Sequence, residues 1–401
     1  MAGSKARSRA GRIAGGGAGG IAGHRPGGRR GRRRGSKQHL RLDGVARGLI
    51  AAAAVAALSA CSLVGTGNDG ADGGVGDGTG GDGGTGDGGT VVLVTHDSFA
   101  LPDDLVAAFE EETGYTLETR APGDGGALVN QLILTKDAPL GDAVFGIDNT
   151  FATRAIDEGV LEPYTAEGAV AEYAADDAGS LTAVDMGDVC INVDHEWFTQ
   201  AGVPEPTTLE DLADPAYRDL LVVTNPATSS PGLAFVLATI GAFGEDGWLD
   251  YWAALRDNGV KVAGGWSDAY YVDFSGPSSE GDRPLVLSYA SSPPYEVPEG
   301  ATEAPTGALL DTCFRQVEYA GVLAGAENPE GARAVVDWLL SPEVQAAIPE
   351  SMYMYPVTDV ELPESWLQFA PLAPHPFDVE PSLISDNRDA WIEQWTAAVV
   401  G

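Results

Sequence analysis

The sequence predicts an α/β fold built as two lobes. Three observations lead to this prediction. Short apolar segments typical of buried strands alternate with helical segments, the alternation restarts from residue 189 onward, and polar or aromatic residues follow most of the strands. Alternation of this kind is typical of a mostly parallel sheet. Because clefts between lobes are favoured ligand sites, we expect the residues that follow the strands to gather in such a cleft.

The first half of the folded part opens with the apolar run VVLVT and continues with an amphipathic segment. Gly114 is expected to end the first helix, and Asp124 lies at or near the N-cap of the second. The expected elements are strands at 91–95, 116–119 and 143–147 and helices at 102–112 and after 124.

The second half repeats the alternation without a convincing internal sequence repeat. Its expected strands are 189–193, 220–224, 261–263 and 285–288, and its expected helices are 231–240, 331–340, 342–348 and 385–399. Two α/β units within about 310 residues fit two lobes, since each unit is long enough to bury a core.

Charge is distributed unevenly along the chain. Residues 1–60 hold 13 Lys or Arg and one acid, and the remainder holds 10 basic and 58 acidic residues. Such an acidic surface disfavours nucleic acid or an anionic membrane face as a partner. It raises the local concentration of a cationic ligand, although many acidic proteins bind nothing cationic.

The N-terminus is typical of an exported lipoprotein. A basic segment is followed by the apolar run Leu49–Ala60, which is too short to span a bilayer, and then by Cys61. The tetrad LSAC at 58–61 resembles the bacterial lipobox, in which the cysteine is lipidated. We therefore predict an export region at 1–60 and a lipid-anchored, extracytoplasmic protein. An uncleaved apolar segment is the alternative.

The next segment, 61–90, is predicted to be a tether that follows the lipidated Cys61. Residues 62–90 contain 14 Gly and five Asp and almost no bulky side chains. A segment of this composition buries too little apolar surface to offset its chain entropy.

Most candidate ligand residues follow the expected strands. Trp266, Tyr289, Tyr295 and Tyr353 are able to sandwich a flat ring or face a cation, or they are ordinary core aromatics. The Asp124 carboxylate is able to pair with a cation or an amino group, and Gly125 permits close backbone approach; a helix cap and a turn glycine are the alternative readings. The pair Ser229–Ser230 precedes a helix and suits an anion such as phosphate, or is plain N-capping.

Sequence motifs that mark common enzymes are absent: the chain has no G-x-S-x-G, H-E-x-x-H, P-loop or C-x-x-C. Neither a catalytic set nor a metal site is expected. Besides Cys61, only Cys190 and Cys313 remain. Outside the cytoplasm this even count favours a disulfide between them.

Several segments together resemble the thiamine-binding subunits of bacterial ABC transporters, over nearly all of residues 91–399. These segments are THDSF at 95–99, GDGG at 123–126, GIDN at 146–149, TSSPGL at 228–233, GWSDAY at 265–270, LSYASSPPY at 287–295, SPEVQ at 341–345 and MYPV at 354–357.

The resemblance implies a two-lobed type II periplasmic-binding-protein fold with two hinge crossovers. The lobes would be 91–189 with 314–401 and 190–313, and Cys190 and Cys313 would lie on or beside the crossovers. It further implies a non-enzymatic monomer without a cofactor, serving a permease and an ATPase subunit of an importer.

The ligand would be thiamine or its mono- or diphosphate. Family ligand contacts carry over to Asp124, Gly125, Ser229, Ser230, Trp266, Tyr289, Ala290, Ser291 and Ser292, with Tyr295 and Tyr353 at aromatic pocket positions. The rings and Asp124 suit the thiazolium and aminopyrimidine, and the serines suit a phosphate. His96 stands where the family often has Tyr, and Tyr353 stands where it can have Trp.

Three other functions remain open from sequence. A ferric-iron or other solute-binding protein has the same fold, and Tyr289 with Tyr295 invites that reading. A thiaminase-like enzyme would need Cys190 or Cys313 as its nucleophile. A surface adhesion lipoprotein would bind no small molecule.

Overall fold

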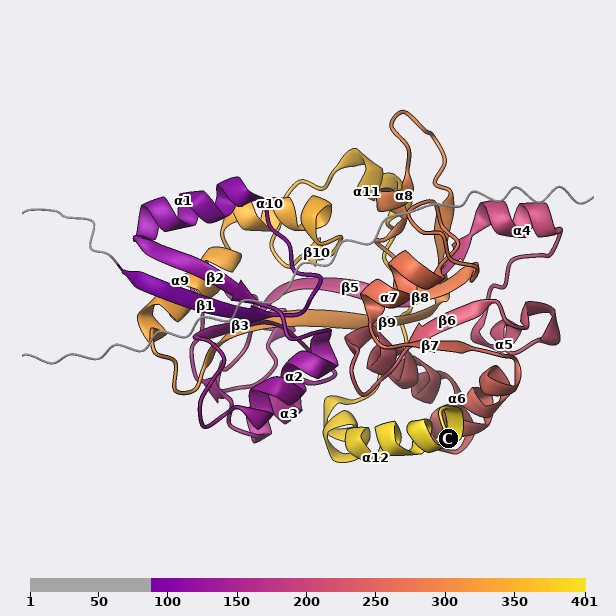
Figure 1. The fold of residues 1–401 in the computed structure, drawn as a ribbon, viewed down its shortest axis with the longest axis horizontal. Helices are drawn as coiled ribbons and strands as arrows, with labels where there is room; N and C mark the ends of the chain where they lie inside the picture. Colours follow the sequence, from indigo (N-terminus) through magenta and orange to yellow (C-terminus); the bar gives the residue numbers. More distant parts are fainter. Residues whose placement is uncertain (1–87) are drawn as a thin grey trace, which may run out of the picture. The chain divides into compact units, whose positions relative to one another are not determined.

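Two long antiparallel strands organise the computed structural model, which describes residues 88–401. Strands β5 (Thr182–Asp194) and β9 (Thr306–Leu323) lie side by side at the centre of one sheet, ordered β2-β1-β3-β9-β5-β8-β6-β7 (Figure 1). Two short strands join its middle, β4 against β9 and β10 against β5. The other strands are β1 (Gly89–Thr95), β2 (Tyr115–Arg120), β3 (Ala143–Asp148), β4 (Leu161–Glu162), β6 (Leu221–Thr224), β7 (Lys261–Ala263), β8 (Leu285–Tyr289) and β10 (Tyr355–Pro356).

The helices of this part of the chain are mostly short. They are α1 (Asp103–Thr113), α2 (Gly125–Leu134), α3 (Ala152–Asp157), α4 (His195–Ala201), α5 (Leu209–Leu212), α6 (Ser230–Asp257), α7 (Trp266–Asp268), α8 (Pro293–Glu296), α9 (Pro329–Leu339), α10 (Pro342–Ser351), α11 (Glu364–Phe369) and α12 (Pro381–Val399), with short turns η1 (Ala171–Tyr173), η2 (Pro215–Tyr217) and η3 (Ala269–Asp273).

Each strand and helix predicted from the sequence is present; most ends shift by a few residues, whereas β5 and α6 are much longer than predicted. Gly114 ends α1 in the left-handed conformation at φ 75°, and Asp124 is the N-cap of α2, where its side chain accepts from the Gly125 N–H. The helix predicted at 231–240 extends to Asp257 across a break at Gly244, whose φ is 70°. Local sequence therefore determines these elements.

The prediction of a mostly parallel sheet is wrong. Strands β1, β2 and β3 pair in parallel, as do β6, β7 and β8, but every pairing made by β5 or β9 is antiparallel. The prediction failed because β9 was not recognised and β5 was expected only at 189–193. Both strands carry buried charged residues, so neither reads as a continuous apolar run.

The sheet is covered on both faces in its first half. One core joins Phe109 of α1 to Val335 of α9 and Val344 of α10, and it packs on β1 and β3. A larger core on the other side includes Leu128 of α2 and continues to Phe235 of α6 in the second half. Figure 1 shows α1 and α10 on one side of this part of the sheet and α2 and α3 on the other. These helices cover the faces of the sheet and not the carboxyl end of β1, where His96 lines a cleft.

The two lobes join at β5 and β9, where the pairing changes register. Val189 lies opposite Phe314 and Ile191 lies opposite Leu309. Cys190 and Cys313 fall inside this interruption and form a disulfide across 123 residues of sequence. Next to them the Arg315 guanidinium pairs with the buried Asp188 carboxylate at 2.8 Å. These two strands are the crossovers that the fold class requires.

The last helix makes its main contacts with the second half of the fold. Trp395 of α12 packs edge-on against Trp252 of α6, and Arg256 of α6 donates to the Ala398 carbonyl at 2.7 Å. The sequence-based boundary assigns all of 314–401 to the first lobe, whereas these contacts join α12 to α6 of the other lobe.

The export region at 1–60, the lipidated Cys61 and most of the predicted tether at 61–90 lie outside the described residues. Gly89 and Thr90, the last two tether residues, instead belong to β1, where they pair with β2. Among residues 88–401, no helix combines the length and the apolar character needed to cross a membrane.

Removal of the disulfide tests its contribution to stability. We expect Cys190→Ser with Cys313→Ser to lower the free energy of unfolding by about 2–5 kcal/mol, because the unfolded chain regains the entropy of a long open loop. Chemical denaturation of the double variant and the oxidised wild type measures the difference. Equal denaturation midpoints with equal slopes would show that the bond contributes nothing.

Candidate functional site

The ends of strands from both lobes meet in a cleft beside the crossovers. From the first lobe come His96, which follows β1, and Asp124 and Gly125 at the start of α2. From the second come Ser230 at the start of α6 and Trp266 at the start of α7. Nine of the twelve predicted ligand residues line this cleft: His96, Asp124, Gly125, Ser230, Trp266, Tyr289, Ser292, Tyr295 and Tyr353.

The cleft has an outer and an inner chamber, which share Ser98, Trp266 and Tyr353 among their walls. The outer chamber measures about 370 Å³, within the range of roughly 300–1,000 Å³ typical of small-molecule sites. The inner chamber is smaller, about 50 Å³, and opens beside His96, Asp124 and Glu318. A ligand of two parts fits this division.

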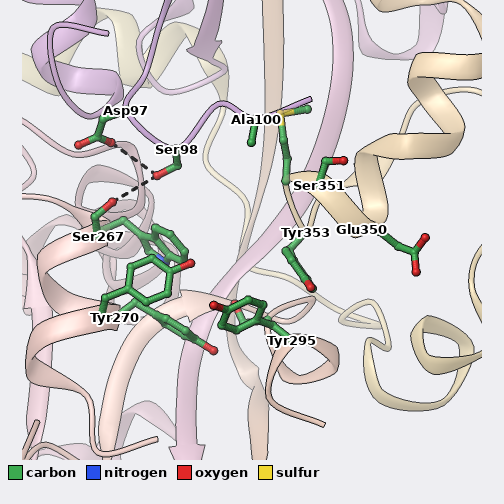
Figure 2. A pocket seen from close by; sticks show the side chains of 13 residues that line it. Asp97, Ser98, Ala100, Ser267, Tyr270, Tyr295, Glu350, Ser351 and Tyr353 are labelled. Carbon is green, nitrogen blue, oxygen red and sulfur yellow. Dashed lines mark hydrogen bonds between the residues drawn. The ribbon is translucent and has the colours of Figure 1, made fainter. Parts of the chain in front are cut away.

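Five of the thirteen residues that line the outer chamber are aromatic. Trp266 stacks on Tyr270 at 5.1 Å between ring centroids, and Tyr295 meets Tyr353 edge-on at 5.1 Å. Figure 2 shows Tyr270, Tyr295 and Tyr353 around the opening, and the hydrogen bonds of the Ser98 hydroxyl with Asp97 and Ser267. Tyr353 has the unusual φ of 56°, a conformation in which strain is often stored at functional sites.

Asp124 clamps the two lobes together. Its Oδ1 accepts from the Gly125 N–H at 2.6 Å, and its Oδ2 accepts from the Trp266 N–H of the second lobe at 2.8 Å. Burial raises the pKa of Asp124, and the Trp266 N–H opposes that rise. A Cβ atom on Gly125 would lie 2.0 Å from the Ser230 Oγ, so only glycine allows α2 to approach α6 this closely. The structure is thus closed around the cleft.

Three predicted ligand residues lie behind the cleft wall. Ser229, Ala290 and Ser291 are fully buried and line neither chamber. Ser230 and Ser292 do line the cleft, but their hydroxyls form hydrogen bonds with Asp148 and with Ser288. The buried Ser229 and Ser291 hydroxyls donate to the Thr224 hydroxyl and the Tyr353 carbonyl. In this closed arrangement the four hydroxyls expected to hold a phosphate bond to the protein itself.

Sequence reasoning missed the acidic floor of the cleft. Glu318 lies in β9 directly opposite Asp148 of β3 on one side and Asp185 of β5 on the other. All three are buried. Burial raises the pKa of Asp148 to about 6, while the Ser230 hydroxyl opposes this rise. Charged residues within otherwise apolar strands are the sequence feature that indicates such a floor. The pattern does not predict β9, so the sequence gives no reason to place Glu318 beside Asp148 and Asp185.

His96 connects this floor to the inner chamber. Its Nδ1 accepts from the Ser98 N–H at 3.1 Å, which leaves the proton of the neutral ring on Nε2, 3.6 Å from Glu318 Oε2. Burial opposes the charged ring, but the neighbouring Glu318 raises the pKa of His96 above its usual value. Gly146, at φ 98°, makes room for this ring, since a Cβ there would lie 2.2 Å from it.

Other lining residues were also not selected from the sequence. Glu350, Met352 and Tyr271 line the outer chamber, and Met354 lines the inner one. Neither chamber is lined by Lys or Arg, and within the described part of the chain no cluster of His, Cys, Asp and Glu is arranged to hold a metal ion. The chemistry of the cleft is aromatic and acidic.

Comparison with known proteins places the chain in a family. Residues 142–378 match the family described as bacterial extracellular solute-binding protein. The chain belongs to this family. The thiamine-binding periplasmic protein of Escherichia coli K12 is 30% identical over 77% of this chain and 93% of its own length. The thiamine-binding periplasmic protein of Brucella suis is 28% identical over 77% and 92%.

Solved structures agree with this solute-binding fold. A periplasmic thiamin binding protein superposes with a TM-score of 0.67 at 27% identity and covers 77% of this chain and 96% of its own. A ferric binding protein from Campylobacter jejuni superposes with a TM-score of 0.62 at 16% identity over 77% and 99%, which shows a shared fold alone. The predicted two-lobed periplasmic-binding-protein fold is confirmed. As a member of this family, the protein is a binding component rather than an enzyme.

The buried Asp148 makes stability depend on pH. Its pKa rises from 3.8 to about 6 on folding, so the native state binds the proton more tightly. Protonated Asp148 therefore contributes to the free energy of unfolding fully below pH 4, and this contribution is lost as pH rises through 6. For this group alone the loss is roughly 3 kcal/mol. We expect Asp148→Asn to flatten the pH dependence of the unfolding free energy between pH 4 and 7.

Denaturant titrations at several pH values in that window measure this slope. Asp97→Asn is the control, because it removes an exposed carboxylate from the cleft. A slope in Asp148→Asn equal to that of the wild type would contradict this assignment.

Proposed function

We propose that this protein captures thiamine, or a thiamine mono- or diphosphate, outside the cytoplasm and delivers it to the permease and ATPase of an ABC importer. The observation that carries the proposal is the cleft itself, in which Trp266 and several tyrosines surround a space that acids line and no Lys or Arg lines. The thiamine-binding relatives over most of the chain support the same ligand.

The two chambers suit the parts of thiamine. The thiazolium carries a fixed positive charge, which the faces of Trp266 and tyrosine rings attract. The aminopyrimidine is flat and carries an amino group able to donate to a carboxylate. A cleft with these walls is chemically consistent with a cationic two-ring ligand, with contacts proposed at His96, Asp124, Gly125, Trp266 and Tyr289.

Ferric iron is the second candidate, and only the shared fold supports it. The two tyrosines that could bind iron already contact other side chains. The Tyr289 hydroxyl accepts from the Gln316 amide at 3.1 Å, and the Tyr295 ring packs on Tyr353. Titration with Fe(III) alongside thiamine distinguishes the two ligands.

The site of anchoring is part of the proposal. The lipobox-like tetrad at 58–61 and the glycine-rich segment after it support a protein held at the membrane by lipid on Cys61, with the folded part acting as a monomer on a tether.

Truncation of the central aromatic tests the ligand site. We expect Trp266→Ala to weaken thiamine binding at least about tenfold, because the ligand loses both a stacking surface and the ring face that attracts its cation. Isothermal titration calorimetry measures the affinity. Trp197→Ala, on α4 outside the cleft, should bind as the wild type does. Absence of any heat or thermal shift with thiamine or its phosphates in the wild type would refute the proposed ligand.

Substitution of the predicted lipid site tests the anchor. We expect Cys61→Ser to abolish incorporation of radiolabelled palmitate and to abolish stable anchoring by lipid. Gel autoradiography and cell fractionation report the two effects. Labelling of the variant equal to that of the wild type would exclude Cys61 as the lipidated residue.

A further inference from the structure

Three buried carboxylates form a row across β3 and the two crossover strands. Asp148, Glu318 and Asp185 occupy directly paired positions on β3, β9 and β5. Side chains at directly paired positions point to the same face about 5 Å apart, and like charges there repel. All three residues are buried, so water screens this repulsion poorly.

The three acids differ in how well their oxygens are satisfied. Asp148 accepts from the Thr150 N–H at 2.6 Å and from the Ser230 hydroxyl. Glu318 Oε1 accepts from the Gln316 amide at 3.0 Å, and its Oε2 faces His96. Neither oxygen of Asp185 has a hydrogen-bond donor, although the residue is fully buried. A buried carboxylate without donors is strongly unfavourable, so Asp185 carries a proton in this state.

Glu318 is the member of the row that reaches the ligand cleft. It lines the inner chamber together with His96, Asp124 and Tyr289. Both oxygens of Asp124 already accept backbone N–H groups, whereas the Glu318 carboxylate accepts no backbone N–H, and its Oε2 lies 3.6 Å from the His96 ring. Glu318 therefore has the spare acceptor capacity that a cationic or amino group entering the inner chamber would use.

We propose that Glu318 and Asp185 together form the counter-charge for the ligand's positive charge, and that ligand binding drives off the proton that this pair holds in the empty protein. The inference rests on the proposed function, because it requires a cationic ligand. When that cation lies beside Glu318, it stabilises a second negative charge on the pair. The proton on Asp185 then passes to solvent, and the charge of the site is balanced by the ligand.

The groups that face the pair support this assignment. They are His96 after β1, Asp124 before α2, Asp148 on β3, Tyr289 on β8 and Gln316 on β9. Burial and the facing Glu318 raise the pKa of Asp185 well above its usual value. His96 and Asp148 also face Glu318 and are able to release a proton to solvent when a cation approaches, so the test must separate them from Asp185.

Calorimetric titration with thiamine at pH 6–7, in buffers of different ionisation enthalpy, measures the protons released. We expect the wild type to release up to about one proton, and its affinity to rise with pH by up to about tenfold per unit. Asp185→Asn should bind thiamine with no proton release from this pair and a flat pH profile. Asp97→Asn, which removes a carboxylate of the outer chamber, should retain the release, as should His96→Gln and Asp148→Asn.

The outcomes are distinguishable. Thiamine binding whose heat is independent of the buffer overturns this inference and leaves the proposed function intact. Release that persists in Asp185→Asn but disappears in His96→Gln or in Asp148→Asn also overturns it, because the proton then belongs to that other residue. No binding by the wild type refutes the proposed function itself, and the inference with it. If Asp185→Asn fails to fold, Glu318→Gln, which also removes one charge of the pair, should abolish the release.

Discussion

The antiparallel pairing of β5 with β9 is the constraint on which the rest of this structure depends. These two strands are the only long elements shared by the two parallel half-sheets in the described part of the chain. Their register places the carboxylates of Asp185 and Glu318 side by side, and the interruption in that register contains the disulfide. The joint between the lobes and the floor of the ligand cleft are therefore the same pair of strands.

Elements that join the lobes also line the cleft. Asp124 holds the second lobe through the Trp266 N–H, and Trp266 is itself the largest aromatic surface of the cleft. A change in the charge of the floor acts on strands that join the lobes, while a ligand that contacts Trp266 acts on the clamp that closes them. Burial makes both effects strong, because charges in these positions are poorly screened.

The walls of the cleft match the rings and the phosphate of the proposed ligands to different degrees. No Lys or Arg lines either chamber, and the hydroxyls of Ser230 and Ser292, which line the inner one, are hydrogen-bonded to Asp148 and Ser288. A phosphate on the ligand would have to find its donors in backbone N–H groups that Asp124 occupies in this closed arrangement. The aromatic and acidic walls match the ring and cation parts of the proposed ligand more directly than a phosphate tail.

The sequence by itself determined the local elements and most of the cleft. Short apolar runs, Gly114 and Asp124 define strands, a helix end and a helix cap through local backbone preferences. The residues after the predicted strands include eight that line the site, and Tyr353 is the ninth predicted residue that does so. Only the tertiary structure decided the antiparallel crossovers and the acidic floor. Glu318 and Asp185 are 133 residues apart in sequence, so no local pattern could show that they are neighbours. A strand is predicted from its apolar pattern, and the buried charge of Glu318 interrupts that pattern in β9. The strand pairing that places this charge beside its neighbours exists only in the folded protein.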